Sequence, residues 1–116
     1  IGYNKNFKDA LKIMNQKKLG IVVVLKKNHI LGLVTDGDLR RELKFKNISE
    51  NKKIVNFITK NPLVVSENVP AQKALAIMNE KQITSLLIVA DKEIVKTNKS
   101  LKGIIHIHQL LQSGIK

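Results

Sequence analysis

The chain has 116 residues, of which 43% are hydrophobic, and it carries a formal net charge of +12. This length suits one compact domain or two small halves that share a core. The absence of cysteine excludes disulfides and thiolate chemistry, and no apolar run approaches the ~20 residues of a membrane-spanning helix. We therefore expect a soluble cytoplasmic protein, and because the sequence opens in mid-pattern at Ile1, we expect it to be part of a longer one.

The first half of the sequence predicts two helices and two strands. Apolar residues at helical spacing predict a helix over Phe7–Lys17, with Asn6 as its N-cap. The β-branched runs at residues 19–25 and 30–35 predict two strands that pair as a hairpin. A Thr-Asp-Gly-Asp cluster then leads into a helix predicted over residues 38–45.

The second half of the sequence follows a polar, lysine-rich connector at residues 47–61, which should contain a short helix that ends before Pro62. Its predicted elements are, in order, a strand at 63–66, a helix at 70–81, a strand at 83–90, a charged loop at 91–102, a strand at 103–106 and a helix at 108–112. Pro70 should occupy the first turn of its helix. Each half therefore reads as one β-α-β-β-α unit.

The two halves are copies of one unit. Residues 10–15 (ALKIMN) match residues 74–79 (ALAIMN) at an offset of 64 positions, and residues 32–39 (GLVTDGDL) match residues 103–110 (GIIHIHQL) at an offset of 71. At the offset of 64, the strand at 63–65 of the second copy aligns only with Ile1 in the first copy. The first copy, as given, therefore lacks most of its first strand. Because each small sheet would leave an apolar face bare, we expect the two copies to pack together.

The turn between the hairpin and the second helix gathers polar side chains. Thr35 or Asp36 can accept hydrogen bonds from the first helix amides, and Asp38 falls in the first turn, where the helix dipole favours a carboxylate. Gly37 should let the backbone come close to another group or adopt a positive φ. Such a turn holds donors and acceptors rigidly at one edge of a sheet.

This repeated unit, ending in Gly-aliphatic-aliphatic-Thr-x-x-Asp-Leu, resembles the CBS domain, which occurs as a pair. The segment FITKNPLVV and the helical ALxIM pattern strengthen the resemblance, which covers the whole chain. It implies a mixed α/β (α+β) fold of two repeats in a pseudo-two-fold arrangement. The first repeat would span residues 1–46, the connector residues 47–61 and the second repeat residues 62–116.

A narrower resemblance concerns the stretches LGIVVVLKKNHILGLVTDGDLRREL and GIIHIHQLLQSGI. They are similar to the C-terminal CBS pair of bacterial arabinose-5-phosphate isomerases. In that family an N-terminal sugar-isomerase domain interconverts ribulose 5-phosphate and arabinose 5-phosphate for lipopolysaccharide synthesis. The resemblance implies a regulatory module that lacks catalytic residues of its own, is attached to an isomerase domain, and forms a homodimer through its helices.

The resemblance also implies a small anionic ligand in the cleft between the repeats, either AMP or ATP or a CMP-activated sugar acid. Thr35 would bond to phosphate or ribose, Asp38 would accept from the ribose hydroxyls, and Arg41 could reach a phosphate. The full set of candidate ligand-binding residues is Thr35, Asp36, Asp38, Arg41, Pro62, Leu63, Thr84, Ser85, His106, His108 and Gln109.

Each candidate also has a plainer interpretation. Thr35 and Asp38 could simply cap a helix, and Gln109 in the place of Asp38 leaves open a ligand-free oligomerisation module. His106 and His108 have the spacing of two ligands on one strand face, but a zinc site needs three or four ligands. We therefore expect no metal site there, and we favour a capped helix start over Mg²⁺ binding by the acidic residues of the first turn.

The positive charge alone could indicate a nucleic-acid-binding domain. However, 21 residues are basic and nearly all of them are lysines scattered along the chain, while aromatic residues make up only 3%. Proteins that read bases use arginine forks and stacked aromatic rings. The composition thus favours a solvated lysine-rich surface, with nucleic-acid binding as the less favoured alternative.

Overall fold

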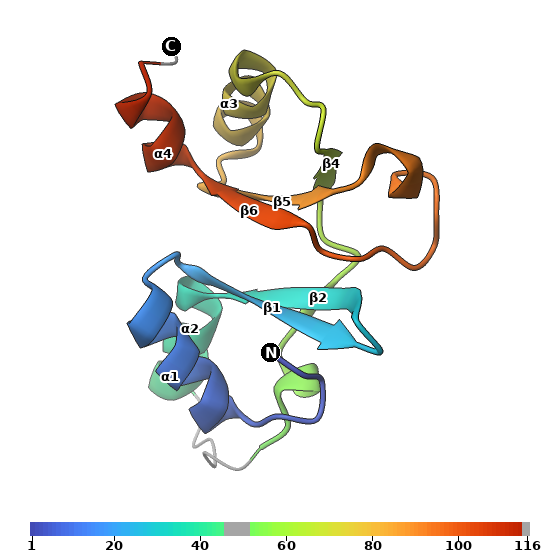
Figure 1. The fold of residues 1–116 in the computed structure, drawn as a ribbon. Coiled ribbons are helices and arrows are strands. Elements are labelled where there is room, and N and C mark those ends of the chain that lie inside the picture. The colour runs from blue at the N-terminus through green and yellow to red at the C-terminus, as the bar shows by residue number, and fades with distance from the viewer. Residues whose placement is uncertain (46–51, 115–116) are drawn as a thin grey trace. The chain divides into compact units, whose positions relative to one another are not determined.

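A computed structural model describes residues 1–45 and 52–114 of the chain. The chain divides into two compact units, Ile1–Pro62 and Leu63–Lys116, each a mixed α/β arrangement of a small sheet and helices (Figure 1). The predicted fold class is therefore confirmed. The boundaries proposed for the two repeats and the connector stay a prediction. Among the described residues, no helix combines the length and the apolar character needed to cross a membrane.

The first unit has one three-stranded antiparallel sheet, in the order β1-β2-β3. Its elements are α1 (Phe7–Lys17), β1 (Ile21–Lys26), β2 (His29–Thr35), α2 (Asp36–Phe45), a 3₁₀ turn η1 (Ile54–Asn56) and β3 (Thr59–Lys60). Both α1 and α2 lie on the same face of the sheet (Figure 1). The short helix predicted in the connector is this 3₁₀ turn. Ser49, where the Ser-Glu pair of the sequence favours a helix start, lies outside the described residues.

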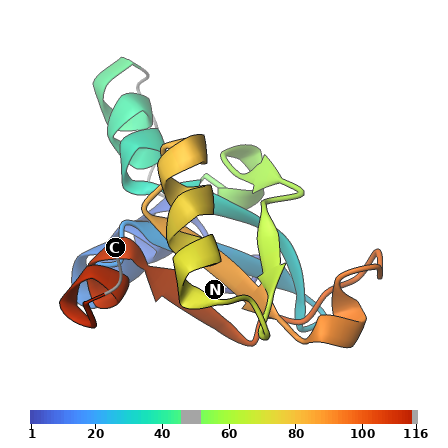
Figure 2. The same ribbon diagram turned by 90° about the horizontal axis from the view of Figure 1, so that it is seen from above.

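The second unit has a three-stranded sheet in the order β4-β5-β6, with β4 parallel and β6 antiparallel to β5. Its elements are β4 (Val64–Ser66), α3 (Ala71–Lys81), β5 (Ser85–Val89), a 3₁₀ turn η2 (Asp91–Glu93), β6 (Gly103–His106) and α4 (Ile107–Gln112). Figures 1 and 2 show α3 and α4 on one face of this sheet.

The strand registers confirm the internal duplication. In the first hairpin Val23 lies opposite Leu33, and in the second sheet Leu87 lies opposite Ile104. Val23 and Leu87 are 64 positions apart, and Leu33 and Ile104 are 71 positions apart. These are the two offsets of the sequence match. The two sheets therefore use the same residues of the repeat to pair their central strands.

Within residues 1–116, the first copy contains the end of the strand that corresponds to β4. Gly2 forms an isolated parallel bridge with Leu25, and Ser66 pairs in parallel with Val89 at the equivalent place in the second copy. As predicted, only the end of that strand lies within residues 1–116. The third position of the first sheet is instead taken by β3, on the opposite side of the hairpin.

Each unit buries one apolar helix face against its sheet. Met14 of α1 and Met78 of α3, which are equivalent in the repeat, are 6% and 0% exposed, so both are core residues as expected. The core of the first unit consists of Phe7, Ala10, Met14, Val22, Val24, Val34, Leu39 and Ile54. The core of the second unit consists of Val65, Ala74, Met78 and Leu86.

Backbone geometry explains where the helices begin and end. Asn6 caps α1 as predicted. Its side-chain Oδ1 accepts from the backbone amide of Asp9 at 3.0 Å, and its backbone amide donates to the Asp9 carboxylate at 3.1 Å. Pro70 is the N-cap of α3 rather than its first residue, because its backbone is still extended. Both helices end at left-handed residues, Lys18 and Gln82, which are equivalent in the repeat.

Three predicted boundaries were wrong by about two residues. β1 begins at Ile21 rather than at residue 19, because Gly20 has a φ of 77° and interrupts the extended backbone. β5 begins at Ser85 rather than at residue 83. α2 begins at Asp36 rather than Asp38, because Thr35 is the residue that caps it.

Candidate functional site

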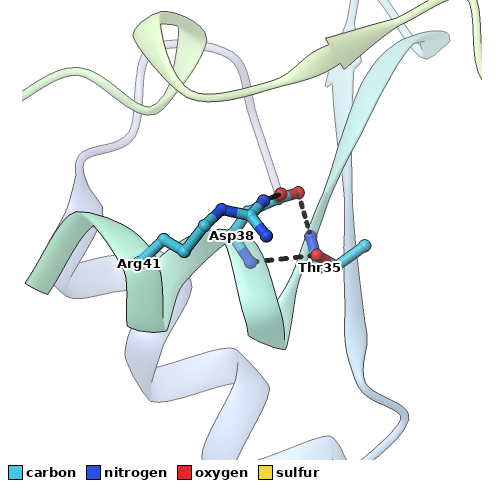
Figure 3. Close-up of polar contacts among 3 residues, drawn as sticks. All are labelled: Thr35, Asp38 and Arg41. Atoms are coloured by element: carbon cyan, nitrogen blue, oxygen red, sulfur yellow. Dashed lines mark hydrogen bonds and ion pairs between the residues drawn. The ribbon is translucent and has the colours of Figure 1, made fainter. Parts of the chain in front are cut away.

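The turn between β2 and α2 is closed by two reciprocal hydrogen bonds. The Asp38 amide donates to Thr35 Oγ1 at 3.0 Å, and the Thr35 amide donates to Asp38 Oδ2 at 3.0 Å (Figure 3). Two amides at this helix start are therefore satisfied by side chains, as in a capping box. The capping role predicted for Thr35 and Asp38 is confirmed, and it fixes both side chains at the end of the strand.

The remaining oxygen of Asp38 accepts from the Arg41 guanidinium, one turn further along α2 (Figure 3). The Asp38 side chain is 21% exposed and the Arg41 side chain 66% exposed, so this ion pair lies at the rim of the turn. A carboxylate oxygen can accept more than one hydrogen bond, and a guanidinium has five N–H donors. The trio can therefore cap the helix and still offer acceptors and donors to a bound molecule.

Asp36 points to a different partner. Its Oδ2 lies 2.8 Å from Arg40 Nη2, in an ion pair between side chains that are 41% and 78% exposed. Such a surface pair contributes about 0–1 kcal/mol and leaves both groups in contact with solvent. The two acidic residues of the first turn are thus engaged by two different arginines, while Asp36 takes no part in the cap.

Gly37 does not have the role that the sequence suggested. It lies in the first turn of α2, it is absent from the residues with positive φ, and an added Cβ would approach nothing closer than Thr35 Oγ1 at 3.8 Å. Among the described residues, nothing at position 37 therefore requires glycine, either for a left-handed backbone or for the close approach of another group.

The substitution Gly37→Ala should therefore stabilise the protein. We expect a gain of about 0.4–1 kcal/mol in the free energy of unfolding, because alanine restricts the unfolded chain and fits the helical backbone. Urea denaturation followed by circular dichroism measures the change. A loss of stability would show that the turn tolerates no methyl group at position 37.

The second turn, between β6 and α4, has the same architecture with different groups. The His106 amide donates to Gln109 Oε1 at 3.0 Å, and the His108 amide donates to His106 Nδ1 at 3.2 Å. The two imidazole rings stack with centroids 4.8 Å apart. Because Nδ1 of His106 accepts, this hydrogen bond assigns the proton of the neutral ring to Nε2.

The idea that His106 and His108 share one strand face is wrong. His106 is the last residue of β6 and caps the helix, whereas His108 already belongs to α4. The two rings are close because the imidazole of the N-cap residue His106 stacks on that of His108 in the first turn of α4. The second turn thus presents two imidazoles and an amide where the first presents a hydroxyl, a carboxylate and a guanidinium.

The segments ahead of the central strands support the two turns in the same way. The Ile107 amide donates to the Thr84 carbonyl at 2.8 Å, and the Asp36 amide donates to the Gly20 carbonyl at 2.9 Å. Thr84 and Gly20 are equivalent in the repeat. Gly20 was not among the predicted site residues, although the offset of 64 positions from Thr84 would have identified it.

The structure brings most candidate residues together within their own units. In the first unit these are Thr35, Asp38 and Arg41, with Asp36 beside them. In the second unit Ser85 lies opposite His106 in the sheet, next to Thr84, His108 and Gln109. Pro62 and Leu63 form the junction between the units, and Leu63 is 45% exposed. Ligand binding by any of these residues stays a prediction.

Comparison with known proteins assigns the family. The model of the CBS domain matches residues 1–44 and 52–115. The chain therefore belongs to the CBS domain family, and it carries two copies of the repeat that fold and cap their second helices alike.

Among curated proteins, the chain is similar to the arabinose 5-phosphate isomerase KdsD of Yersinia pestis, with 35% identity over 111 residues, 95% of this chain and 32% of that protein. The chain thus spans about a third of the length of the curated relatives it matches.

Two solved structures illustrate the fold. A signal-transduction protein with CBS domains from Burkholderia ambifaria is 25% identical, with a TM-score of 0.79, over 98% of this chain and 79% of that one. CBSX2, solved in complex with AMP, is 22% identical, with a TM-score of 0.77, over 98% of this chain and 84% of that one. The second likeness concerns the fold alone.

Proposed function

We propose that this chain is the cytoplasmic regulatory CBS pair of an arabinose 5-phosphate isomerase-like protein, and that it binds a small anionic ligand, a nucleotide or a nucleotide-sugar. The observation that carries the proposal is the Thr35–Asp38–Arg41 arrangement, in which a carboxylate and a guanidinium are held at the end of a strand. The similarity to KdsD and the AMP complex of CBSX2 support it.

The chemistry of the first turn suits a nucleotide. Asp38 lies beside Arg41 and can accept from the two hydroxyls of a ribose, while the exposed Arg41 can donate to a phosphate. The excess of lysine, part of the net charge of +12, attracts anions to the surface and raises their rate of encounter. A ligand position between the repeats stays a prediction from the family resemblance.

Regulation would follow from differential binding. A ligand that binds one arrangement of the repeats more tightly than another shifts the population towards that arrangement. The attached catalytic domain of the longer protein would then respond to the concentration of the ligand. In this proposal the isomerase chemistry belongs to that other domain, and this chain contributes the sensor.

The substitution Asp38→Asn tests the proposed contact. We expect it to weaken the binding of AMP or of a CMP-linked sugar acid by roughly tenfold or more, because hydrogen bonds to a charged group contribute about 1.5–3 kcal/mol. The asparagine oxygen can still accept from the Thr35 amide, so the helix cap survives. Isothermal titration calorimetry with both compounds measures the affinity.

Asp9→Asn is the matched control, because Asp9 makes the same capping box with Asn6 at the start of α1. It should change stability by a similar amount and leave the affinity unaltered. If neither compound produces heat with the unmodified chain, the proposed ligand classes are excluded. Equal weakening by both variants would mean that Asp38 acts only through helix stability.

The second candidate function is a ligand-free oligomerisation module. Two observations favour it: Gln109 replaces the carboxylate at the second turn, and the second helices of the repeats carry exposed leucines. Leu43 of α2 is 54% exposed and Leu111 of α4 is 51% exposed. A thermal melt with a nucleotide panel separates the two functions, since a ligand that binds the folded state raises the melting temperature.

The proposed homodimer through the helices is testable with Leu43→Ser and Leu111→Ser. Full burial of a leucine contributes about 1.5–3 kcal/mol, so each change should weaken a dimer by roughly tenfold or more. Analytical ultracentrifugation measures the dissociation constant. Val95→Ser is the control, because Val95 is 90% exposed but lies outside the helices. A dimer that both leucine variants leave intact would place the interface elsewhere.

A further inference from the structure

The segment ahead of α1 and one face of that helix border an open cavity of about 250 Å³ in the first unit. Most of its lining side chains are polar, and the full set is Lys5, Asp9, Lys12 and Gln16, together with Ile1 and Ile13. Drug-sized ligands occupy cavities of roughly 300–1,000 Å³, so this cavity suits one smaller molecule. It shares no lining residue with the turn that holds Thr35 and Asp38.

The charged groups of this cavity are anchored, but their charges are not used up by one another. The Lys5 backbone is fixed on both sides, because its amide and its carbonyl make backbone hydrogen bonds of 3.1 and 2.9 Å. Asp9 is fixed by the helix cap, in which its Oδ2 accepts from the Asn6 amide at 3.1 Å. The ammonium groups of Lys5 and Lys12 form no ion pair with any other described residue. Both cations and the second carboxylate oxygen are therefore available to a bound molecule.

The second repeat shows that the fold does not require these lysines. At the offset of 64 positions Lys5 corresponds to Val69, and Lys12 corresponds to Ala76. An apolar residue just ahead of an N-cap commonly packs against the helix as a hydrophobic staple, and Val69 does pack against the core of its unit. Lys5 is exposed instead. The first repeat has thus replaced an apolar contact with positive charge at the position that borders the cavity.

We propose that this cavity binds a small phosphorylated sugar. The ammonium groups of Lys5 and Lys12 can donate to the phosphate, and the Ile13 side chain can contact the carbon skeleton. The Asp9 carboxylate and the Gln16 amide can bond to sugar hydroxyls. A phosphate ion alone would gain nothing from the carboxylate, whereas a hydroxyl donates to it. This inference goes beyond the proposed function, because the nucleotide contact proposed there uses other residues.

The probe is ribose 5-phosphate, titrated into the ¹⁵N-labelled 116-residue chain and followed by NMR. We expect saturable shifts at the amides of the residues that line the cavity on α1, which are Asp9, Lys12, Ile13 and Gln16. Ribose alone and inorganic phosphate alone should each bind at least about tenfold more weakly, because each keeps only part of the hydrogen bonds to charged groups. Asp38→Asn should bind the probe as the unmodified chain does, which separates this test from that of the nucleotide contact.

Lys5→Val and Lys12→Ala introduce the residues of the second repeat and should each weaken binding by about tenfold or more. Lys5→Val should also melt at or above the temperature of the unmodified chain, because valine restores the staple. Lys8→Ala is the matched control, since Lys8 is an exposed lysine of α1 that does not line the cavity, and it should bind normally. Undiminished binding to both cavity variants would overturn the proposal. So would equal affinity for inorganic phosphate, unmoved amides along α1, or shifts confined to Thr35 and Asp38.

Discussion

Gly32→Ala is expected to destabilise the protein by about 1–3 kcal/mol, the range for a side chain forced into a space that is already filled. The added methyl group would lie 2.4 Å from the Thr59 carbonyl oxygen and 3.2 Å from the Ile58 side chain. Because the first of these contacts is backbone, a rotamer change cannot relieve it. β3 must therefore move away from β2, and the residues before it lose part of their packing.

Gly103→Ala is the matched control, since it changes the same position of the other repeat. With nothing within 4 Å of the new Cβ, we expect unchanged stability or a gain of about 0.5–1 kcal/mol. Urea denaturation followed by circular dichroism gives both values. Similar effects of the two substitutions would mean that the strand pairing at Gly32 is not what distinguishes the repeats.

Phe7→Ala is expected to lower the free energy of unfolding by about 3–5 kcal/mol, as for other fully buried aromatic residues. Phe7 is 0% exposed at the start of α1, and its ring meets the edge of Phe57 with centroids 5.4 Å apart. The substitution leaves a cavity between the helix and the segment that leads into β3. Such a loss is a large part of the free energy of unfolding of a small protein.

Tyr3→Ala serves as the control for Phe7→Ala, because Tyr3 is also aromatic but is 43% exposed. Its substitution should lower the free energy of unfolding much less. Thermal and urea denaturation of the two variants measure the difference. A loss below about 1 kcal/mol for Phe7→Ala would contradict the packing of α1 described above, since it would fall within the range of ordinary surface changes.

The duplicated pattern of the sequence predicts most of the fold because it acts at two levels. Local periodicity places α1 at Phe7–Lys17, the bounds that the structure has. The repeat then predicts the pairing of β5 with β6 from that of β1 with β2, since equal sequences bury equal faces. Agreement between local pattern and long-range repeat makes this part of the prediction strong.

β3 was missed because a two-residue strand has no periodicity to detect. Thr59 and Lys60 read as part of a polar connector, and their pairing with Leu33 and Gly32 depends on contacts far apart in the sequence. The sequence did contain an indirect signal, the glycine at position 32 within an otherwise aliphatic strand. Glycine in such a place often marks a close backbone approach.

The candidate site was only partly predictable. Capping rules identify Thr35 and Asp38, because a hydroxyl at the cap and an acid three residues later satisfy the first helix amides. His106 was not expected as a cap, since imidazole is not among the preferred N-cap groups. Capping and ligand binding use the same oxygens of Thr35 and Asp38, so the residue types cannot separate the two roles.

An NMR titration of the ¹⁵N-labelled chain with AMP and with a CMP-linked sugar acid tests most directly whether the repeated turns form a ligand site. We expect saturable shifts at the amides of Thr35 and Asp38, and at those of His106 and Gln109, for at least one compound. Amides that stay unmoved at both turns, with the two compounds at millimolar concentration, would show that these turns bind neither ligand.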